Sequence, residues 1–186
     1  MLNEYYFVTE WRVKSTCEEV YRILEKAEDL QRWWPSVYLD VMETEKGQPG
    51  GIGKKVSLYT KGWLPYTLRW NFEVTKAEFP RGFALKAYGD LEGRGEWVFT
   101  QEGDTCCARY EWHVLAEKPV LKMFSFLLKP VFSANHHWAM KKGLESLEIE
   151  LERLKKTAGS AQKNVPLPPG PVFPHNLTNN KKLAYK

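Results

Sequence analysis

Hydrophobic and polar residues alternate with a period of two near the start of the chain. Over residues 5–14, Phe7 and Trp11 fall on one face, whereas Glu10 and Arg12 fall on the other. Successive side chains of a strand point to opposite faces of a sheet. The alternation therefore predicts a strand over 5–14 with one apolar and one polar face.

Helical features follow this strand directly. Thr16 with Glu19 three residues later forms the pattern of a capping box, and the next apolar residues recur at helical spacing. They are Val20, Ile23, Leu24, Ala27 and Leu30. The stretch LQRWWPSVY (30–38) continues this pattern into a second short helix, which Pro35 should end. Two adjacent indoles on a helix cannot face the same way, so one or both of Trp33 and Trp34 must be buried by a segment from elsewhere in the fold, either as core or as part of a cavity wall.

Beyond residue 37 the period of two returns and is interrupted by turn sequences. It predicts six strands, at 37–46, 54–61, 66–78, 82–91, 94–101 and 105–116. Consecutive strands joined by such short links must be antiparallel, because parallel neighbours need long crossover connections. Together with the first strand, the sheet should contain about seven strands.

The last part of the folded region should be helical. Pro119 and Pro130 bracket 120–129, which we expect to be a separate short helix or turn. A long helix is predicted over 131–157, and Gly143 beside its apolar stripe indicates a close approach to the sheet. The stripe consists of His137, Met140, Leu144, Leu147, Leu151 and Leu154.

Composition divides the chain and excludes several classes. The 186 residues carry a formal net charge of +4 from scattered Lys and Arg, which is typical of a solvated surface rather than a nucleic-acid interface. We expect a domain over 1–157 and a flexible Pro- and Asn-rich tail over 158–186. Three cysteines fit neither a disulfide framework nor a zinc motif. We therefore expect a cytoplasmic protein with no metal, no cofactor and no integral membrane segment.

Four motifs stand in a particular order along this pattern: Trp33–Pro35, Gly89–Trp97, Thr105–Trp112 and Asn135–Gly143. Over residues 5–157 the chain resembles the START-like helix-grip superfamily (SRPBCC), in particular its polyketide cyclase/dehydrase and lipid-transport branch. The resemblance implies an α+β helix-grip fold, with a curved seven-stranded antiparallel sheet around a long C-terminal helix and two short helices after strand 1. It also implies a deep apolar cavity between sheet and helix. It does not select a function, because the superfamily contains carriers, sensors and enzymes.

The phase of the strands sorts residues between the cavity and the outside. Acidic residues fall on the outer face, namely Glu73, Asp90, Glu92, Glu96 and Glu111, whereas aromatic residues fall on the inner face. Inward polar groups are few: Thr9, Tyr110, the indole N–H groups and His137. His137 is either a satisfied core histidine or a group that contacts the ligand. The candidate ligand-binding residues are Trp11, Trp33, Trp34, Trp70, Phe72, Phe83, Leu85, Trp97, Phe99, Tyr110, Trp112, His137 and Met140.

Three functions fit these features. The first is a carrier or sensor that binds a small hydrophobic or aromatic molecule in the cavity, including lipid binding. The alternative is a cyclase/dehydratase-like enzyme, for which the resemblance leaves Tyr110 and His137 as acid–base candidates. The third is an interaction module that uses the 158–186 tail or the 120–132 segment. The expected partner is a small apolar or aromatic ligand rather than nucleic acid, and either a monomer or a homodimer is possible.

Overall fold

The computed structural model describes residues 3–117, 119–157 and 165–172, with backbone only for 119–128. Strand β1 (Glu4–Val13) is followed by helix α1 (Cys17–Leu24), a 3-10 turn at Ala27–Asp29 and helix α2 (Leu30–Trp33). Six strands come next, and the long helix α3 (Pro119–Thr157) ends the domain. The six are β2 (Tyr38–Glu45), β3 (Lys55–Lys61), β4 (Thr67–Glu78), β5 (Gly82–Gly89), β6 (Leu91–Glu102) and β7 (Thr105–Ala116).

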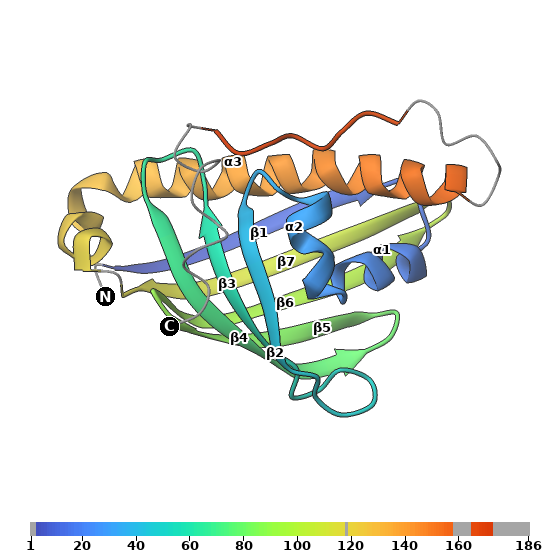
Figure 1. Cartoon of the computed structure of the whole chain (residues 1–186), viewed down its shortest axis with the longest axis horizontal. Coiled ribbons are helices and arrows are strands. Elements are labelled where there is room, and N and C mark those ends of the chain that lie inside the picture. Colours follow the sequence, from blue (N-terminus) through green and yellow to red (C-terminus); the bar gives the residue numbers. More distant parts are fainter. Residues whose placement is uncertain (1–2, 118, 158–164, 173–186) are drawn as a thin grey trace.

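The strands form one antiparallel sheet in the order β1-β7-β6-β5-β4-β3-β2. The sheet curves, α3 lies across its concave side, and α1 and α2 lie near the C-terminal half of that helix (Figure 1). This is the seven-stranded helix-grip arrangement that the sequence predicted. The predicted strand phases are also confirmed, because inner residues such as Trp97 and Trp112 are buried while Glu92 and Glu96 are exposed.

The two short helices follow from local sequence signals. Thr16 Oγ1 accepts a hydrogen bond from Glu19 N at 3.2 Å, and a Glu19 carboxylate oxygen accepts one from Thr16 N at 3.2 Å. This capping box satisfies two backbone N–H groups at the start of α1. α2 ends at Trp33, two residues before Pro35. A residue that precedes proline is disfavoured in the helical region, so the helix cannot continue into β2.

The last helix differs from the prediction at two places. The expected separate element over 120–129 was wrong, because α3 begins at Pro119 and contains Pro130. Proline suits the first position of a helix, and inside one it produces a bend; Figure 1 shows the first turns set at an angle to the rest. The apolar stripe was correct at Met140, Leu147 and Leu151, but Leu154 is exposed.

His137 was also placed wrongly on the buried stripe. It is exposed, and its Nδ1 lies 2.7 Å from the carbonyl oxygen of Ser133 one turn earlier. Consecutive residues of a helix point about 100° apart. Asn135 and His136 take the inward positions instead.

Most of the predicted 158–186 tail lies outside the described residues. The described stretch, 165–172, is extended and runs along the outer side of α3 (Figure 1). In the described part of the chain, no helix combines the length and apolar character that a membrane span requires.

A candidate ligand cavity between the sheet and helix α3

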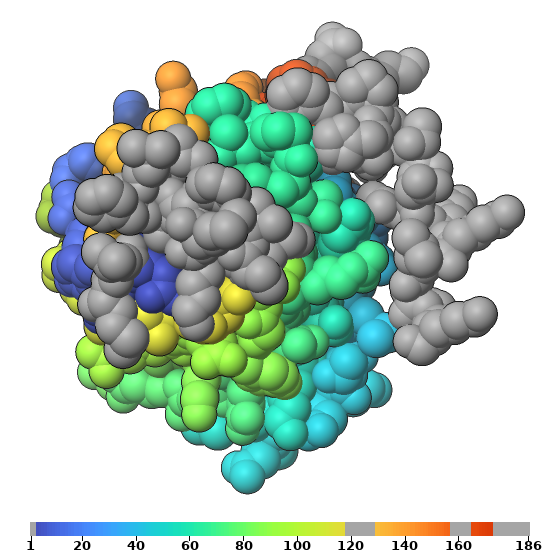
Figure 2. Space-filling view, turned by 90° about the vertical axis from the view of Figure 1, so that its left-hand side faces the viewer, coloured from blue at the N-terminus to red at the C-terminus, as the bar shows by residue number. Residues whose placement is uncertain are grey.

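A cavity of about 160 Å³ lies between the concave side of the sheet and the first half of α3. Figure 2 views the molecule from this end, with β1 in blue, the part of α3 from Pro130 onward in orange and β3 and β4 in green. Its lining combines rings, small aliphatic groups and a few polar side chains. The lining residues are Tyr5, Phe7, Trp34, Val37, Tyr38, Thr60, Lys61, Gly62, Tyr66, Leu68, Trp70, Leu91, Tyr110, Trp112, Val114, Ala116, Phe132, Asn135, His136, Ala139 and Met140.

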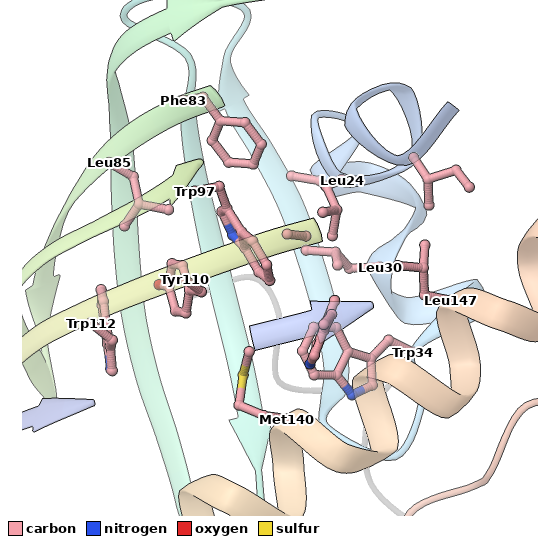
Figure 3. Close-up of a cluster of buried hydrophobic side chains, with 14 of the residues drawn as sticks. Leu24, Leu30, Trp34, Phe83, Leu85, Trp97, Tyr110, Trp112, Met140 and Leu147 are labelled. Carbon is pink, nitrogen blue, oxygen red and sulfur yellow. The ribbon is translucent and has the colours of Figure 1, made fainter. Parts of the chain in front are cut away.

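Aromatic side chains of β4 and β7 form the inner wall. Tyr110 and Trp112 of β7 stack with ring centres 5.9 Å apart, and Trp112 lies 5.7 Å from Trp70 of β4. Met140 lines the same cavity from α3. Figure 3 shows Met140 on the helix side of the cluster, whereas Tyr110 and Trp112 lie on the sheet side. The strand alternation places these rings on one face. The wall is therefore fixed by the sheet rather than by a loop.

Trp34 enters the cavity wall from α2, while its neighbour Trp33 is fully buried and does not line the cavity. The indole of Trp34 lies against Gly143 of α3. A Cβ at that glycine would stand 2.2 Å from Cζ2 of the indole. The predicted close approach at Gly143 is thus real, but the group that approaches is Trp34 rather than the sheet.

A buried carboxylate connects α2 to α3. Glu150 accepts hydrogen bonds from both terminal nitrogens of Arg32, at 2.9 and 2.8 Å, and from Arg153 at 2.8 and 2.6 Å. Burial raises the pKa of Glu150, but the hydrogen bonds from Arg153 and Arg32 outweigh it, and the pKa falls to about 2. Because Arg32 lies two residues before Trp34, this ion pair helps to hold the indole over the cavity.

Polar groups gather at one end of the cavity. Lys61 ends β3 and is buried, with 1% of its surface exposed. Desolvation lowers the pKa of its ammonium group, because burial disfavours the charged form. Beside it on the strand, Thr60 accepts a hydrogen bond from the indole nitrogen of Trp70 at 2.9 Å. No Asp or Glu occurs among the described residues that line the cavity.

Asn135 of α3 fixes the link between β3 and β4 at the same end. Its Oδ1 accepts a hydrogen bond from Leu64 N at 3.1 Å, and its Nδ2 donates to the hydroxyl of Tyr66 at 3.4 Å. The amide lies against the backbone of Gly62, where a Cβ would stand 2.2 Å from Oδ1. Glycine at 62 therefore lets α3 contact the segment that follows Lys61.

His136 lines the cavity next to Phe7. The two rings stack with centres 4.0 Å apart and planes inclined by 15°. Burial lowers the pKa of His136 to about 3, and the nearby His137 contributes in the same direction. Its Nε2 is buried and has no hydrogen-bond partner within the described part of the chain. The imidazole is therefore neutral at physiological pH and can offer an acceptor or a donor to a ligand.

The thirteen candidate ligand-binding residues separate into groups. Those that line the cavity are Trp34, Trp70, Tyr110, Trp112 and Met140. Those packed in the aromatic core away from it are Trp11, Trp33, Leu85, Trp97 and Phe99. Phe72 and Phe83 line a second pocket of about 330 Å³ between α1 and the 46–54 loop, whose rim carries Glu25, Lys46 and Lys54. His137 is exposed.

Sequence reasoning missed Lys61, Asn135 and His136. Alternation along β3 places Lys61 with the outward Lys55 and Tyr59, and only the burial pattern, which ends in two consecutive buried residues, distinguishes Lys61 from them. The spacing to Met140 is four residues from His136 and three from His137, and both fit a helix face. Phe132 and Asn135 lie on the same helical face as His136 and Met140. If the helical pattern had been followed back to these two residues, it would have predicted His136 rather than His137 as the inward histidine.

The polar groups of the described cavity wall are hydroxyls, an amide, an imidazole and an amine rather than a cluster of metal ligands. Among the described residues, no three His, Cys, Asp or Glu side chains lie close enough together to hold a metal ion. Burial raises the pKa of Tyr66 to about 12 and that of Tyr110 well above its ordinary value. At neutral pH the described wall therefore presents hydroxyls, an amide, a neutral imidazole and one ammonium group.

Comparison with known proteins identifies the fold. No family model and no curated protein matches the chain. The Zhui aromatase/cyclase from Streptomyces sp. R1128 superposes with a TM-score of 0.65 at 15% identity, covering 84% of this chain and 98% of that one. The protein TTHA0849 from Thermus thermophilus has a TM-score of 0.59 at 17% identity, over 83% and 100% of the two chains. Norcoclaurine synthase from Thalictrum flavum, solved with dopamine and hydroxybenzaldehyde, has a TM-score of 0.55 at 12% identity, over 80% and 87%. The chain thus has the helix-grip fold of these solved structures, the fold that the sequence resemblance implied.

Proposed function

We propose that this protein binds a small apolar or aromatic molecule in the cavity between the sheet and α3, as a carrier or sensor. The observation that supports this most directly is the aromatic-walled space at the first half of α3. Pockets for small molecules combine such apolar walls with a few placed polar groups. The described lining has this composition, with Thr60, Lys61, Asn135 and His136 as the polar groups.

The size of the cavity restricts the ligand. A cavity of about 150 Å³ lined by apolar side chains accommodates benzene, and this cavity measures about 160 Å³. One ring with a short substituent fills that space, whereas a long-chain lipid exceeds it. We therefore favour a single-ring compound over the lipid-type ligands that the sequence left open.

Uptake of neutral single-ring probes tests this proposal. Binding of p-cresol or benzyl alcohol should quench the fluorescence of the wall indoles and raise the Tm of the protein. Ala139→Leu, in the cavity lining, should abolish both effects because the larger side chain fills the cavity. Ala134→Leu is the matched control, since Ala134 lies on the exposed side of the same helix. The proposal fails if no neutral probe binds, or if Ala139→Leu binds as well as Ala134→Leu.

A second candidate is acid–base catalysis of the cyclase/dehydratase kind on a ligand held in this cavity. It is supported by the neutral imidazole of His136 and the hydroxyl of Tyr110, which line the same space. His137, proposed from the sequence for this role, is exposed, so His136 replaces it as the candidate base. His136→Gln should then abolish turnover of a single-ring aromatic substrate and retain its binding, whereas His137→Gln should retain both. Turnover that survives His136→Gln excludes this role.

A further inference from the structure

We propose that the cavity recognises a neutral aromatic carbonyl compound, such as an aryl ketone, whose carbonyl oxygen accepts hydrogen bonds from the hydroxyls of Tyr38 and Tyr110. This inference deepens the proposed binding function and rests on it. It assigns a chemical class of ligand and two recognition residues, which line the cavity from strands near opposite edges of the sheet.

Tyr38 is the first residue of β2, the edge strand of the sheet. Its Cα pairs with that of Thr60 in β3, whose hydroxyl accepts a hydrogen bond from Trp70 on the inner face. Side chains directly opposite each other on antiparallel strands share one face, so Tyr38 also points inward. Its ring meets the indole of Trp34 edge to face, with centres 5.2 Å apart. The strand pairing and this ring contact together position the Tyr38 side chain at the cavity.

Tyr110 reaches the same cavity from β7, next to the opposite edge strand. Its ring stacks on Trp97 with centres 4.5 Å apart and on Trp112 with centres 5.9 Å apart, and Figure 3 shows it between these two indoles. A side chain at Gly95 of β6 would overlap the Tyr110 hydroxyl. The glycine therefore leaves this hydroxyl its place on the inner surface of the sheet.

The protein itself uses neither hydroxyl. Neither forms a hydrogen bond within the described part of the chain, and neither oxygen is sealed by its neighbours as Nε2 of His136 is. Burial raises the pKa of Tyr38 and of Tyr110, and electrostatic repulsion from Tyr38 adds to the rise at Tyr110, so the two hydroxyls lie in the same part of the cavity. A hydroxyl withdrawn from water without a partner costs free energy, which a ligand that bonds to it would restore.

Two hydroxyl donors match a single carbonyl oxygen. Such an oxygen has two lone pairs and can accept two hydrogen bonds, and each tyrosine hydroxyl supplies one donor. The described lining gives an ion little compensation: it contains no Asp or Glu, His136 is neutral with a pKa of about 3, and Lys61 already interacts within the protein. Burying an unpaired charge costs far more than burying a neutral polar group. The wall therefore favours a neutral acceptor over an ion.

A pair of isosteric compounds tests this inference by isothermal titration calorimetry at pH 7. Acetophenone carries the carbonyl oxygen, and α-methylstyrene has a methylene group of similar size in its place. We expect acetophenone to bind at least about tenfold more tightly, because only the ketone forms the two hydrogen bonds.

Variants that lack one hydroxyl and keep the ring assign this preference to the two residues. Tyr38→Phe and Tyr110→Phe should each reduce the preference for acetophenone, and the double variant should abolish it. Tyr88→Phe is the matched control and should keep the preference, because Tyr88 of β5 is exposed on the outer face of the sheet.

The outcomes separate the two proposals. Equal affinities for acetophenone and α-methylstyrene in the unmodified protein overturn the inference without any variant, and the binding function stands. A preference for the ketone that survives in the folded double variant also overturns it, because another donor must then supply the recognition. If neither compound binds, the inference fails, and the binding function fails with it only when p-cresol and benzyl alcohol do not bind either.

Discussion

The interior of the grip has two regions that are built from the same kind of side chain, a packed half around Trp97 and a hollow half beside the first half of α3. In the packed half, Trp97 contacts Trp11 with ring centres 4.9 Å apart, and Phe99 with centres 6.0 Å apart. In the hollow half, Trp70 and Trp112 border a cavity of about 160 Å³. The halves meet at Tyr110, which stacks on Trp97 at 4.5 Å and also lines the cavity.

The difference lies in what covers each half. α1 brings Tyr21 against the packed half, where its ring meets Phe99 at 5.9 Å edge to face, and on its other side Tyr21 borders the second pocket together with Phe83. In the hollow half α3 lies across the sheet and presents Ala139 and Met140 among the lining residues. Aromatic content therefore does not decide whether an interior is solid. The interior is filled only where a further layer of side chains lies between the sheet and the helices that cover it.

The largest expected effect compares the same truncation in the two halves. Trp97→Ala should lower the free energy of unfolding by about 4 kcal/mol, because a filled core leaves a new void. Trp112→Ala, on the adjacent strand, should cost about 1–2 kcal/mol less, since its ring already lacks partner atoms on the cavity side. Urea denaturation with a common m-value measures both. Equal losses would mean that the two halves are equally packed, and the comparison would fail.

A second effect uses acid, because the hollow half buries a neutral imidazole. The pKa of His136 is about 3 in the folded protein, against about 6.5 when unfolded. The unfolded state therefore binds the proton first, and stability falls as the pH drops from 6.5 toward 3. The loss is about 1.4 kcal/mol per pH unit, or about 3 kcal/mol at pH 4.5.

His136→Phe should remove this part of the acid sensitivity while changing stability at pH 7 by less than about 1 kcal/mol. The replacement keeps a ring against Phe7. His137→Phe is the matched control, because His137 is exposed. The measurement is the difference in unfolding free energy between each variant and the unmodified protein from pH 7 to 4. An unchanged slope in His136→Phe would show that the imidazole is not buried as described.

Sequence patterns predicted the sheet and the packed half better than the hollow half. Alternation identified Trp97, Phe99 and Trp112 as inward residues, because a regular strand has only two faces. The polar end of the cavity escaped detection for local reasons. Lys61 falls in the outward phase of its strand, and His136 competes with His137 for one helical face. Whether two inward rings touch or leave a gap depends on the element that covers them. The periodicity of the sequence carries no information about the distance between that element and the sheet.

The smallest expected effect concerns Trp34, which stands between the two halves. Its ring lies 5.7 Å from Trp11 on the packed side and lines the cavity on the other. Gly143→Ala would place a Cβ 2.2 Å from this indole. Alanine favours the helix by about 1 kcal/mol, but overpacking costs about 1–3 kcal/mol. The difference is a net loss of up to about 2 kcal/mol, and we expect weaker binding of a cavity probe.

The double variant Gly143→Ala with Trp34→Phe separates the steric contact from any effect on the helix itself. The smaller ring leaves room for the new methyl group, so the double variant should be more stable than the sum of the single changes predicts. A favourable coupling free energy in this cycle assigns the loss to the contact between residue 143 and the indole. If the two changes add without coupling, Gly143 does not position Trp34, and the boundary between the halves must be set elsewhere. A coupling would instead show that one helix glycine fixes where the packed half ends, since a displaced indole must move either into the cavity or against Trp11.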